Sequence, residues 1–99
     1  MIKILIVDDH PIVRNGLKNI IHDESDMRIV CESSTGLQVV DLVKKHKLDI
    51  VILDISLPDI NGFEVLGKLK KLFPDLPVLM LSVLSEDLYA LKSLKAGAS

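Results

Sequence analysis

The sequence predicts an α/β fold in which helices cover both faces of a parallel sheet. Three short apolar runs cover residues 2–7, 50–53 and 78–81, and a polar residue directly follows each of them. Continuous Val, Ile and Leu runs of this length are typical of strands that are buried on both faces. Segments with helical spacing separate the runs, and right-handed crossovers then place helices on both sides of one sheet.

The first strand is predicted to cover residues 2–7, and the first helix to begin at Pro11. A proline suits this position because its missing N–H falls among the unpaired donors of the first helical turn. The apolar face of this helix is expected to contain Ile12, Val13, Leu17, Ile20 and Ile21. Residues 23–26 are acidic and polar, which predicts a loop.

The second strand is predicted over residues 27–32, and its mixed polarity favours a position at an edge of the sheet. We expect Ser33, Ser34 or Thr35 to cap the helix that follows. Its apolar face should hold Leu37, Val39, Val40 and Val43. The basic residues 44–47 suit the end of this helix, since cations interact favourably with the negative end of the helix dipole.

The second half of the chain continues the alternation of predicted strands and helices. A third strand over residues 50–53 leads through a loop with Pro58, Asn61 and Gly62 into a third helix. The apolar face of that helix should contain Phe63, Val65, Leu66, Leu69 and Leu72. A fourth strand covers residues 78–81, and the fourth helix is expected to begin at a Ser85 cap and to end at Gly97. Its apolar positions are Leu88, Leu91 and Leu94.

Length and composition narrow the class of protein. Ninety-nine residues correspond to one domain, and the core must consist of Val, Ile and Leu because only three residues are aromatic. The net charge of −2 and the lack of a basic stripe argue against nucleic-acid binding by this segment. A single cysteine, Cys31, excludes an internal disulfide and favours a reducing compartment. No apolar run approaches the ~20 residues of a membrane span, so we expect a cytoplasmic protein.

Polar side chains at the strand ends predict a magnesium site. Asp8 and Asp9 follow the first strand, Asp54 follows the third and Ser82 follows the fourth. Parallel strands place their carboxyl ends at one edge, where open α/β sheets bind ligands. Asp9 and Asp54 could ligate Mg²⁺ directly, Asp8 could hold a metal-bound water, and the backbone carbonyl of Ser56 could add a ligand. One carboxylate would remain free to attack phosphorus.

Each of these residues also has a simpler structural interpretation. An aspartate just after a strand often only caps a helix or forms a turn, and a hydroxyl such as that of Ser82 often bonds to backbone. For His10 we prefer a half-exposed side chain in the first helical turn over an acid/base group or metal ligand. The convergence of the strand ends nevertheless favours a site, because the structural interpretation does not predict it.

Four motifs resemble the receiver domain of bacterial two-component response regulators. They are the Ile-Leu-Ile-Val-Asp-Asp-His-Pro start, Leu-Asp-Ile-Ser-Leu-Pro-Asp-Ile-Asn-Gly at residues 53–62, Leu-Ser at 81–82 and Lys-Ala-Gly-Ala at 95–98. The first and last of these resemble the subfamily whose receivers precede a helix-turn-helix DNA-binding domain. The resemblance extends over all 99 residues.

The resemblance implies a doubly wound, flavodoxin-like sheet that switches between two conformations. Asp54 would accept a phosphoryl group from a sensor histidine kinase, and Mg²⁺ would bind at Asp8, Asp9, Asp54 and the carbonyl of Ser56. Ser82 would contact the phosphoryl group and move on activation. Such a domain catalyses its own phosphotransfer and dephosphorylation, and is not an enzyme with a diffusible substrate.

The chain also departs from the family pattern. Receivers continue into a fifth strand with a lysine that pairs with the phosphate, an aromatic switch residue and a fifth helix, and this sequence ends at Ser99 before them. We therefore expect residues 1–99 to form a C-terminally incomplete receiver with strand order 2-1-3-4. DNA binding would need a C-terminal domain absent from this chain. Edge-strand association or a homodimer is expected through the exposed fourth strand.

Two alternatives remain from the sequence. A haloacid-dehalogenase-like phosphatase also uses an aspartate after an apolar strand together with Mg²⁺. That family requires an acidic residue two positions after the nucleophile, where this chain has Ser56, and it lacks an Asp-Asp pair at the first strand. The second alternative is a degenerate interaction module that is never phosphorylated, although every expected carboxylate is intact.

Overall fold

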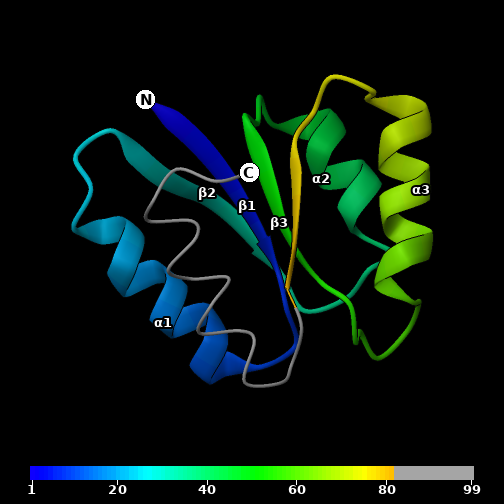
Figure 1. The fold of residues 1–99 in the computed structure, drawn as a ribbon, viewed down its shortest axis with the longest axis horizontal. Helices are drawn as coiled ribbons and strands as arrows, with labels where there is room; N and C mark the ends of the chain where they lie inside the picture. Colours follow the sequence, from blue (N-terminus) through cyan, green and yellow to red (C-terminus); the bar gives the residue numbers. More distant parts are fainter. Residues whose placement is uncertain (82–99) are drawn as a thin grey trace.

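The computed structural model describes residues 1–81, which form a four-stranded parallel sheet between helices (Figure 1). The strands lie in the order β2-β1-β3-β4. Their bounds are Ile2–Val7 for β1, Met27–Ser33 for β2, Ile50–Asp54 for β3 and Val78–Leu81 for β4. The predicted fold class and strand order are thereby confirmed. Strand β2, whose mixed polarity predicted an edge position, lies at an edge of the described sheet, next to β1. The expected fourth helix and Ser82 lie outside the described residues.

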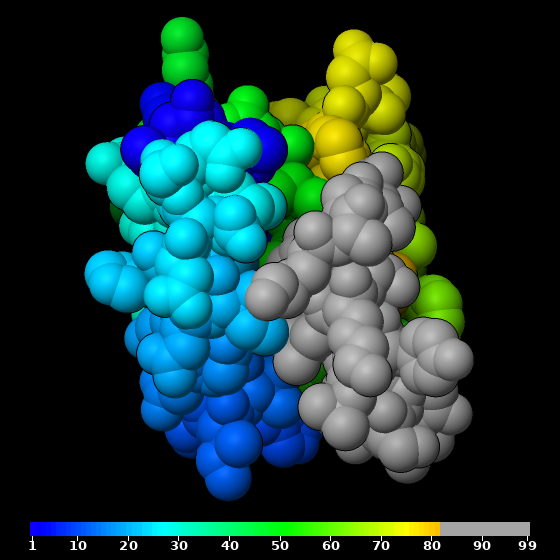
Figure 2. Space-filling model, turned by 60° about the vertical axis from the view of Figure 1, so that its left-hand side comes forward, coloured from blue at the N-terminus to red at the C-terminus, as the bar shows by residue number. Residues whose placement is uncertain are grey.

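Three helices within residues 1–81 cover the two faces of this sheet. Helix α1 (Pro11–His22) packs on one face, and α2 (Val39–Lys45) and α3 (Gly62–Leu72) pack on the other (Figure 1). The outer side of α1 forms part of the molecular surface along the length of the helix (Figure 2). Association through the outer edge of β4 stays a prediction.

The core consists of two layers on either side of the central strands. Ile4 and Ile6 of β1 face α1, where they pack with Leu17 and Ile21. Alternate residues of β1 and β3 point to the opposite face and pack against α2 and α3, as in the cluster of Leu5, Val7, Val51, Leu53, Val39, Val65 and Leu69. Each fully buried side chain of this size contributes about 1.5–3 kcal/mol. This burial holds β1 and β3 side by side and so fixes where their carboxyl ends lie.

Helix α1 begins at Pro11 as predicted, but Ile12 does not face the sheet. Its side chain is 86% exposed, whereas Leu17 and Ile21 are buried. At 3.6 residues per turn Ile12 lies about 140° around the helix from Leu17, outside the apolar stripe. Phe63 of α3 is 59% exposed for the same reason, because it lies about 160° from the buried Val65.

The predicted start of α2 is wrong. The helix begins at Val39, and Gln38 occupies the N-cap position without a side-chain bond that caps the helix; its Oε1 accepts from the Ser33 hydroxyl at 3.3 Å. Ser33 instead extends β2, and its hydroxyl accepts from the Thr35 amide (3.1 Å) and donates to the Thr35 carbonyl (2.7 Å). This serine turn lengthens the connection, so Leu37 precedes the helix and is exposed. Val39 and Val43 form the buried face.

Gly62 is required where the chain turns from β3 into α3. A Cβ at this position would overlap the Asp54 carbonyl oxygen and lie 2.7 Å from Ile55 Cα. We expect Gly62→Ala to reduce the free energy of unfolding by about 1–3 kcal/mol through overpacking. Gly67→Ala in α3 is the control: nothing lies within 4 Å of its Cβ, so it should stabilise the helix by about 0.5–1 kcal/mol. Urea denaturation measures both, and equal effects of the two substitutions would contradict this account.

Candidate functional site

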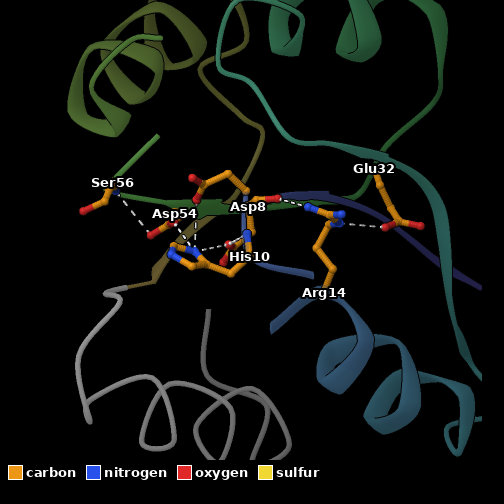
Figure 3. Close-up of polar contacts among 7 residues, drawn as sticks. Asp8, His10, Arg14, Glu32, Asp54 and Ser56 are labelled. Atoms are coloured by element: carbon orange, nitrogen blue, oxygen red, sulfur yellow. Dashed lines mark hydrogen bonds and ion pairs between the residues drawn. The ribbon is translucent and has the colours of Figure 1, made fainter. Parts of the chain in front are cut away.

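The carboxylates predicted to converge do meet at the carboxyl edge of the sheet (Figure 3). Val7 of β1 pairs with Leu53 of β3, so Asp8 and Asp54 follow on neighbouring strands. One ligand atom from each of Asp8, Asp9, His10 and Asp54 lies within 4.8 Å of the others. The sheet register therefore brings together side chains that are far apart in the sequence.

The cluster is buried and incompletely paired. Asp8 and Asp54 are 2% and 0% exposed. Oδ1 of Asp54 accepts a hydrogen bond from the Ser56 amide at 3.3 Å, while Oδ2 of Asp54 and Oδ1 of Asp9 are buried and accept none from the described residues. A buried oxygen without a hydrogen-bond donor reduces the stability of the fold. These two oxygens are therefore available to a cation or a ligand.

The pKa of Asp54 is raised from 3.8 to about 6, and burial is the largest cause. The negative charge of Asp8 contributes to this increase, and the charge of Asp9 has a smaller effect in the same direction. The Ser56 N–H and the His10 ring act against them and favour the ionised form. Asp54 is thus a carboxylate that is destabilised in its ionised state until positive charge comes close.

His10 lies against all three carboxylates. Its Nδ1 is 2.8 Å from Asp8 Oδ1, 3.0 Å from Asp9 Oδ1 and 3.5 Å from Asp54 Oδ2. The hydrogen bond to Asp8 is the main cause that raises the pKa of His10. The side chain is half-exposed as predicted, but the sequence did not predict these contacts. The Asp8-X-His10 spacing is the feature of the sequence that could have predicted them. Asp8 Oδ1 also accepts from the His10 amide (2.8 Å), and this turn brings the His10 ring back towards the carboxylates.

Comparison with known proteins decides the family. The family described as "Response regulator receiver domain" matches residues 4–99. The chain belongs to the response regulator receiver family. This receiver domain is 38% identical over 98 residues to the transcriptional regulatory protein DegU of Brevibacillus brevis, covering 99% of the chain and 42% of DegU. It is 35% identical over 99 residues to the response regulator UvrY of Escherichia coli K12, covering 100% of the chain and 45% of UvrY.

Solved structures agree with this membership. The response regulator domain of Thermotoga maritima CheB superposes with a TM-score of 0.78 at 34% identity, over 99% of this chain and 74% of that one. A LuxR-family response regulator from Aurantimonas gives a TM-score of 0.77 at 31% identity, over 98% and 69% of the two chains. The receiver domain spans less than half the length of the curated relatives named above.

Receiver domains bind Mg²⁺ at an acidic pocket, and the donor set of this chain fits that ion. Mg²⁺ prefers a few carboxylate oxygens and retained waters, and Asp9 Oδ1 is buried without a hydrogen-bond donor among residues 1–81. Asp8, Asp9 and Asp54 are the residues that would hold it. No helix among residues 1–81 is both long and apolar enough to cross a membrane.

Arg14 also contacts the site, which the sequence did not predict. Its Nη1 donates to the Asp8 carbonyl oxygen at 2.5 Å, and its Nε lies 3.3 Å from Glu32 Oε1 on β2 (Figure 3). Lys18 Nζ is 2.6 Å from the other Glu32 oxygen. In this receiver domain Arg14 of α1, paired with Glu32 of β2, therefore holds the backbone of Asp8 in place. Only the packing of α1 beside β2 reveals the contact.

Proposed function

We propose that this receiver domain accepts a phosphoryl group on Asp54 from a sensor histidine kinase and thereby switches a transcriptional regulator. The observation that carries the proposal is the convergence of Asp8, Asp9 and Asp54 at one edge of the sheet, with one buried Asp54 oxygen that accepts no hydrogen bond from the part of the chain that the structure describes. Mg²⁺ would be held by these three carboxylates and the Ser56 carbonyl. It would neutralise charge on the phosphoryl oxygens.

The two oxygens of Asp54 have different roles in this proposal. The Ser56 amide donates to Oδ1 and so fixes the orientation of the carboxylate. Oδ2 accepts no hydrogen bond from any described residue and would act as the nucleophile. A bond forms between Oδ2 and phosphorus as the bond between phosphorus and the kinase histidine nitrogen breaks. The electron pair of the broken bond stays on that imidazole, which takes up a proton.

Ser82 is proposed to contact the phosphoryl group and to move on activation. In support, Leu81 is the last residue of β4 and pairs with Asp54 in the sheet register, so Ser82 follows directly after the neighbour of the phosphoacceptor. A hydroxyl donor to a phosphoryl oxygen would exist only in the phosphorylated state. Such a contact would favour one of two conformations.

The kinase and the DNA are proposed partners of the whole protein. Two of the relatives named above are a transcriptional regulatory protein and a response regulator, and both are more than twice as long as this chain. DNA binding would accordingly belong to a C-terminal domain outside residues 1–99. The net charge of −2 gives this segment no attraction for phosphate backbones.

Beryllofluoride with Mg²⁺ tests the proposed function. It mimics a phosphoryl group, so with both components present we expect amide NMR shifts centred on residues 8–10 and 54–56 beyond the shifts that Mg²⁺ alone causes. Acetyl phosphate should add one phosphoryl group, mapped to Asp54 by mass spectrometry. An unresponsive spectrum would support an interaction module. Repeated turnover of a phosphate ester such as p-nitrophenyl phosphate would support a phosphatase.

Asp9→Ala should weaken Mg²⁺ binding by at least about tenfold, since loss of an outer-shell partner alone typically costs a metal site 10–100-fold. It should also raise metal-free stability, because Asp9 raises the pKa of Asp54 through charge repulsion. Fluorescence or NMR titration measures the affinity, and urea denaturation measures the stability. Asp75→Ala in the loop before β4 is the charge-matched control. Equal Mg²⁺ affinities for wild type and Asp9→Ala would remove Asp9 from the site.

A further inference from the structure

We propose that Asp59 is a positioning residue of the metal site. It ties the β3–α3 loop (residues 55–61) to the turn before α2 (residues 33–38) and thereby fixes the backbone at Ser56. The inference rests on the proposed function, since it concerns the Ser56 carbonyl as a ligand. In Figure 1 the connection from β2 to α2 passes beside the connection from β3 to α3 at the carboxyl edge of the sheet.

The Asp59 carboxylate accepts two backbone hydrogen bonds from the other loop. Oδ1 accepts from the Gly36 amide at 2.8 Å, and Oδ2 accepts from the Leu37 amide at 2.9 Å. These hydrogen bonds, with that from Gly36 the largest cause, lower the pKa of Asp59, so the carboxylate is ionised at neutral pH. The amides precede α2, whose own N-cap residue Gln38 provides no side-chain cap. Both oxygens of Asp59 are therefore committed to one partner segment.

Close packing accompanies these hydrogen bonds. A Cβ on Gly36 would lie 2.9 Å from Ile60 Cγ2, 2.9 Å from Val65 Cγ2 and 3.2 Å from Leu57 Cδ1. Two of these neighbours belong to the same loop as Asp59, so only a residue without a side chain allows the two segments to approach this closely. The turn before α2 thus supports the loop directly.

The turn also contacts the other half of the acidic cluster. The Ser33 carbonyl, where this turn begins, accepts from the Asp8 amide at 3.0 Å. The base of the β3–α3 loop is closed by the Gly62 amide, which donates to the Ile55 carbonyl at 2.9 Å. Ser56 lies between that closed base and the clamped Asp59. One continuous path of contacts therefore joins the Asp8 backbone, the turn before α2 and the loop that carries Ser56.

Release of the clamp should make metal binding less favourable. Without Asp59 the loop loses its two hydrogen bonds to the turn before α2, and Mg²⁺ would have to order the Ser56 backbone further when it binds. A simple helix-capping role predicts a different result. In that case removal of the carboxylate lowers the stability of α2 but leaves the metal affinity of the folded protein unchanged.

The test compares Asp59→Ala, Asp59→Asn and the control Asp75→Ala on the full chain. In Asp59→Ala we expect a Mg²⁺ dissociation constant about tenfold higher, near the lower limit for loss of an outer-shell partner. Amide hydrogen exchange of Gly36 and Leu37 in metal-free protein should be faster. Asp59→Asn keeps one acceptor oxygen and should show a smaller change. At saturating Mg²⁺ the labelling rate with acetyl phosphate should recover.

Each other outcome has a distinct meaning. If Asp59→Ala lowers the melting temperature but binds Mg²⁺ as tightly as wild type, Asp59 is only a cap and the inference is overturned. If Asp59→Ala does not fold, the same comparison is made with Asp59→Asn, and unchanged affinity and exchange there overturn it equally. Failure of the wild type to bind Mg²⁺ would instead overturn the proposed function.

Discussion

Asp54→Asn should abolish phosphorylation and, at the same time, stabilise the metal-free protein at pH 7. The pKa of Asp54 is raised from 3.8 to about 6, so its ionised form is disfavoured in the folded state. A shift of this size corresponds to about 3 kcal/mol at most. We expect a gain of about 1–2 kcal/mol, because the site opens to solvent at the half-exposed His10 and screening reduces the cost. The amide oxygen of asparagine can still accept from Ser56.

Two measurements on Asp54→Asn separate the chemical role from the structural one. Labelling with acetyl phosphate and Mg²⁺ should fall to the background of heat-unfolded protein, since the amide is not a nucleophile. Urea denaturation in EDTA should show the increased stability. Asp75→Asn removes the same charge far from the cluster in sequence and should change neither quantity. Undiminished labelling of Asp54→Asn would assign the nucleophile to another residue.

The metal-free protein should lose stability as the pH rises from about 4 to about 6. The folded pKa of Asp54 lies above its unfolded value, so the folded state binds more protons in this interval. Its contribution to stability is therefore lost as the pH rises through about 6, with a slope of at most about 1.4 kcal/mol per unit. His10 also has a raised pKa, and its contribution is lost above 6.5. Asp59 has a lowered pKa and loses its contribution only in acid.

Comparison of wild type with Asp54→Asn isolates this effect, because the other titrating groups are common to both proteins. The difference in unfolding free energy between them should grow from pH 4.5 to pH 6.5 in EDTA. Saturating Mg²⁺ should reverse the difference at pH 7, since the ion stabilises the folded state that binds it. A difference that is constant across this pH range would contradict the assigned pKa of Asp54.

The convergence of the acidic residues could be predicted from the sequence because it depends only on sheet geometry. Apolar runs before Asp8 and Asp54 identify buried parallel strands, and such strands end at one edge. The mixed polarity of β2 predicted its position at the edge of the sheet, and Pro11 predicted the start of α1. The carboxylates themselves predicted Mg²⁺ and phosphoryl chemistry, and the family motifs then assigned the role of phosphoacceptor to Asp54.

The features that could not be predicted depend on contacts between loops and on local turns. The start of α2 was misplaced because Ser33 continues the β2 ladder and forms a serine turn instead of a cap. The contact of His10 with the carboxylates follows from the turn at Asp8. Asp59 and Gly36 are 23 residues apart, and neither periodicity nor spacing brings them together. Such contacts appear only when the packed structure is known.

The most direct test of the account is a Mg²⁺ titration of the wild-type chain by calorimetry and amide NMR at pH 7. We predict one ion per chain, with amide shifts confined to residues 8–10 and 54–56 and with the affinity reduced in both Asp9→Ala and Asp54→Asn. Absence of saturable binding, or shifts that centre on another part of the chain, would contradict the claim that these carboxylates form a single metal site.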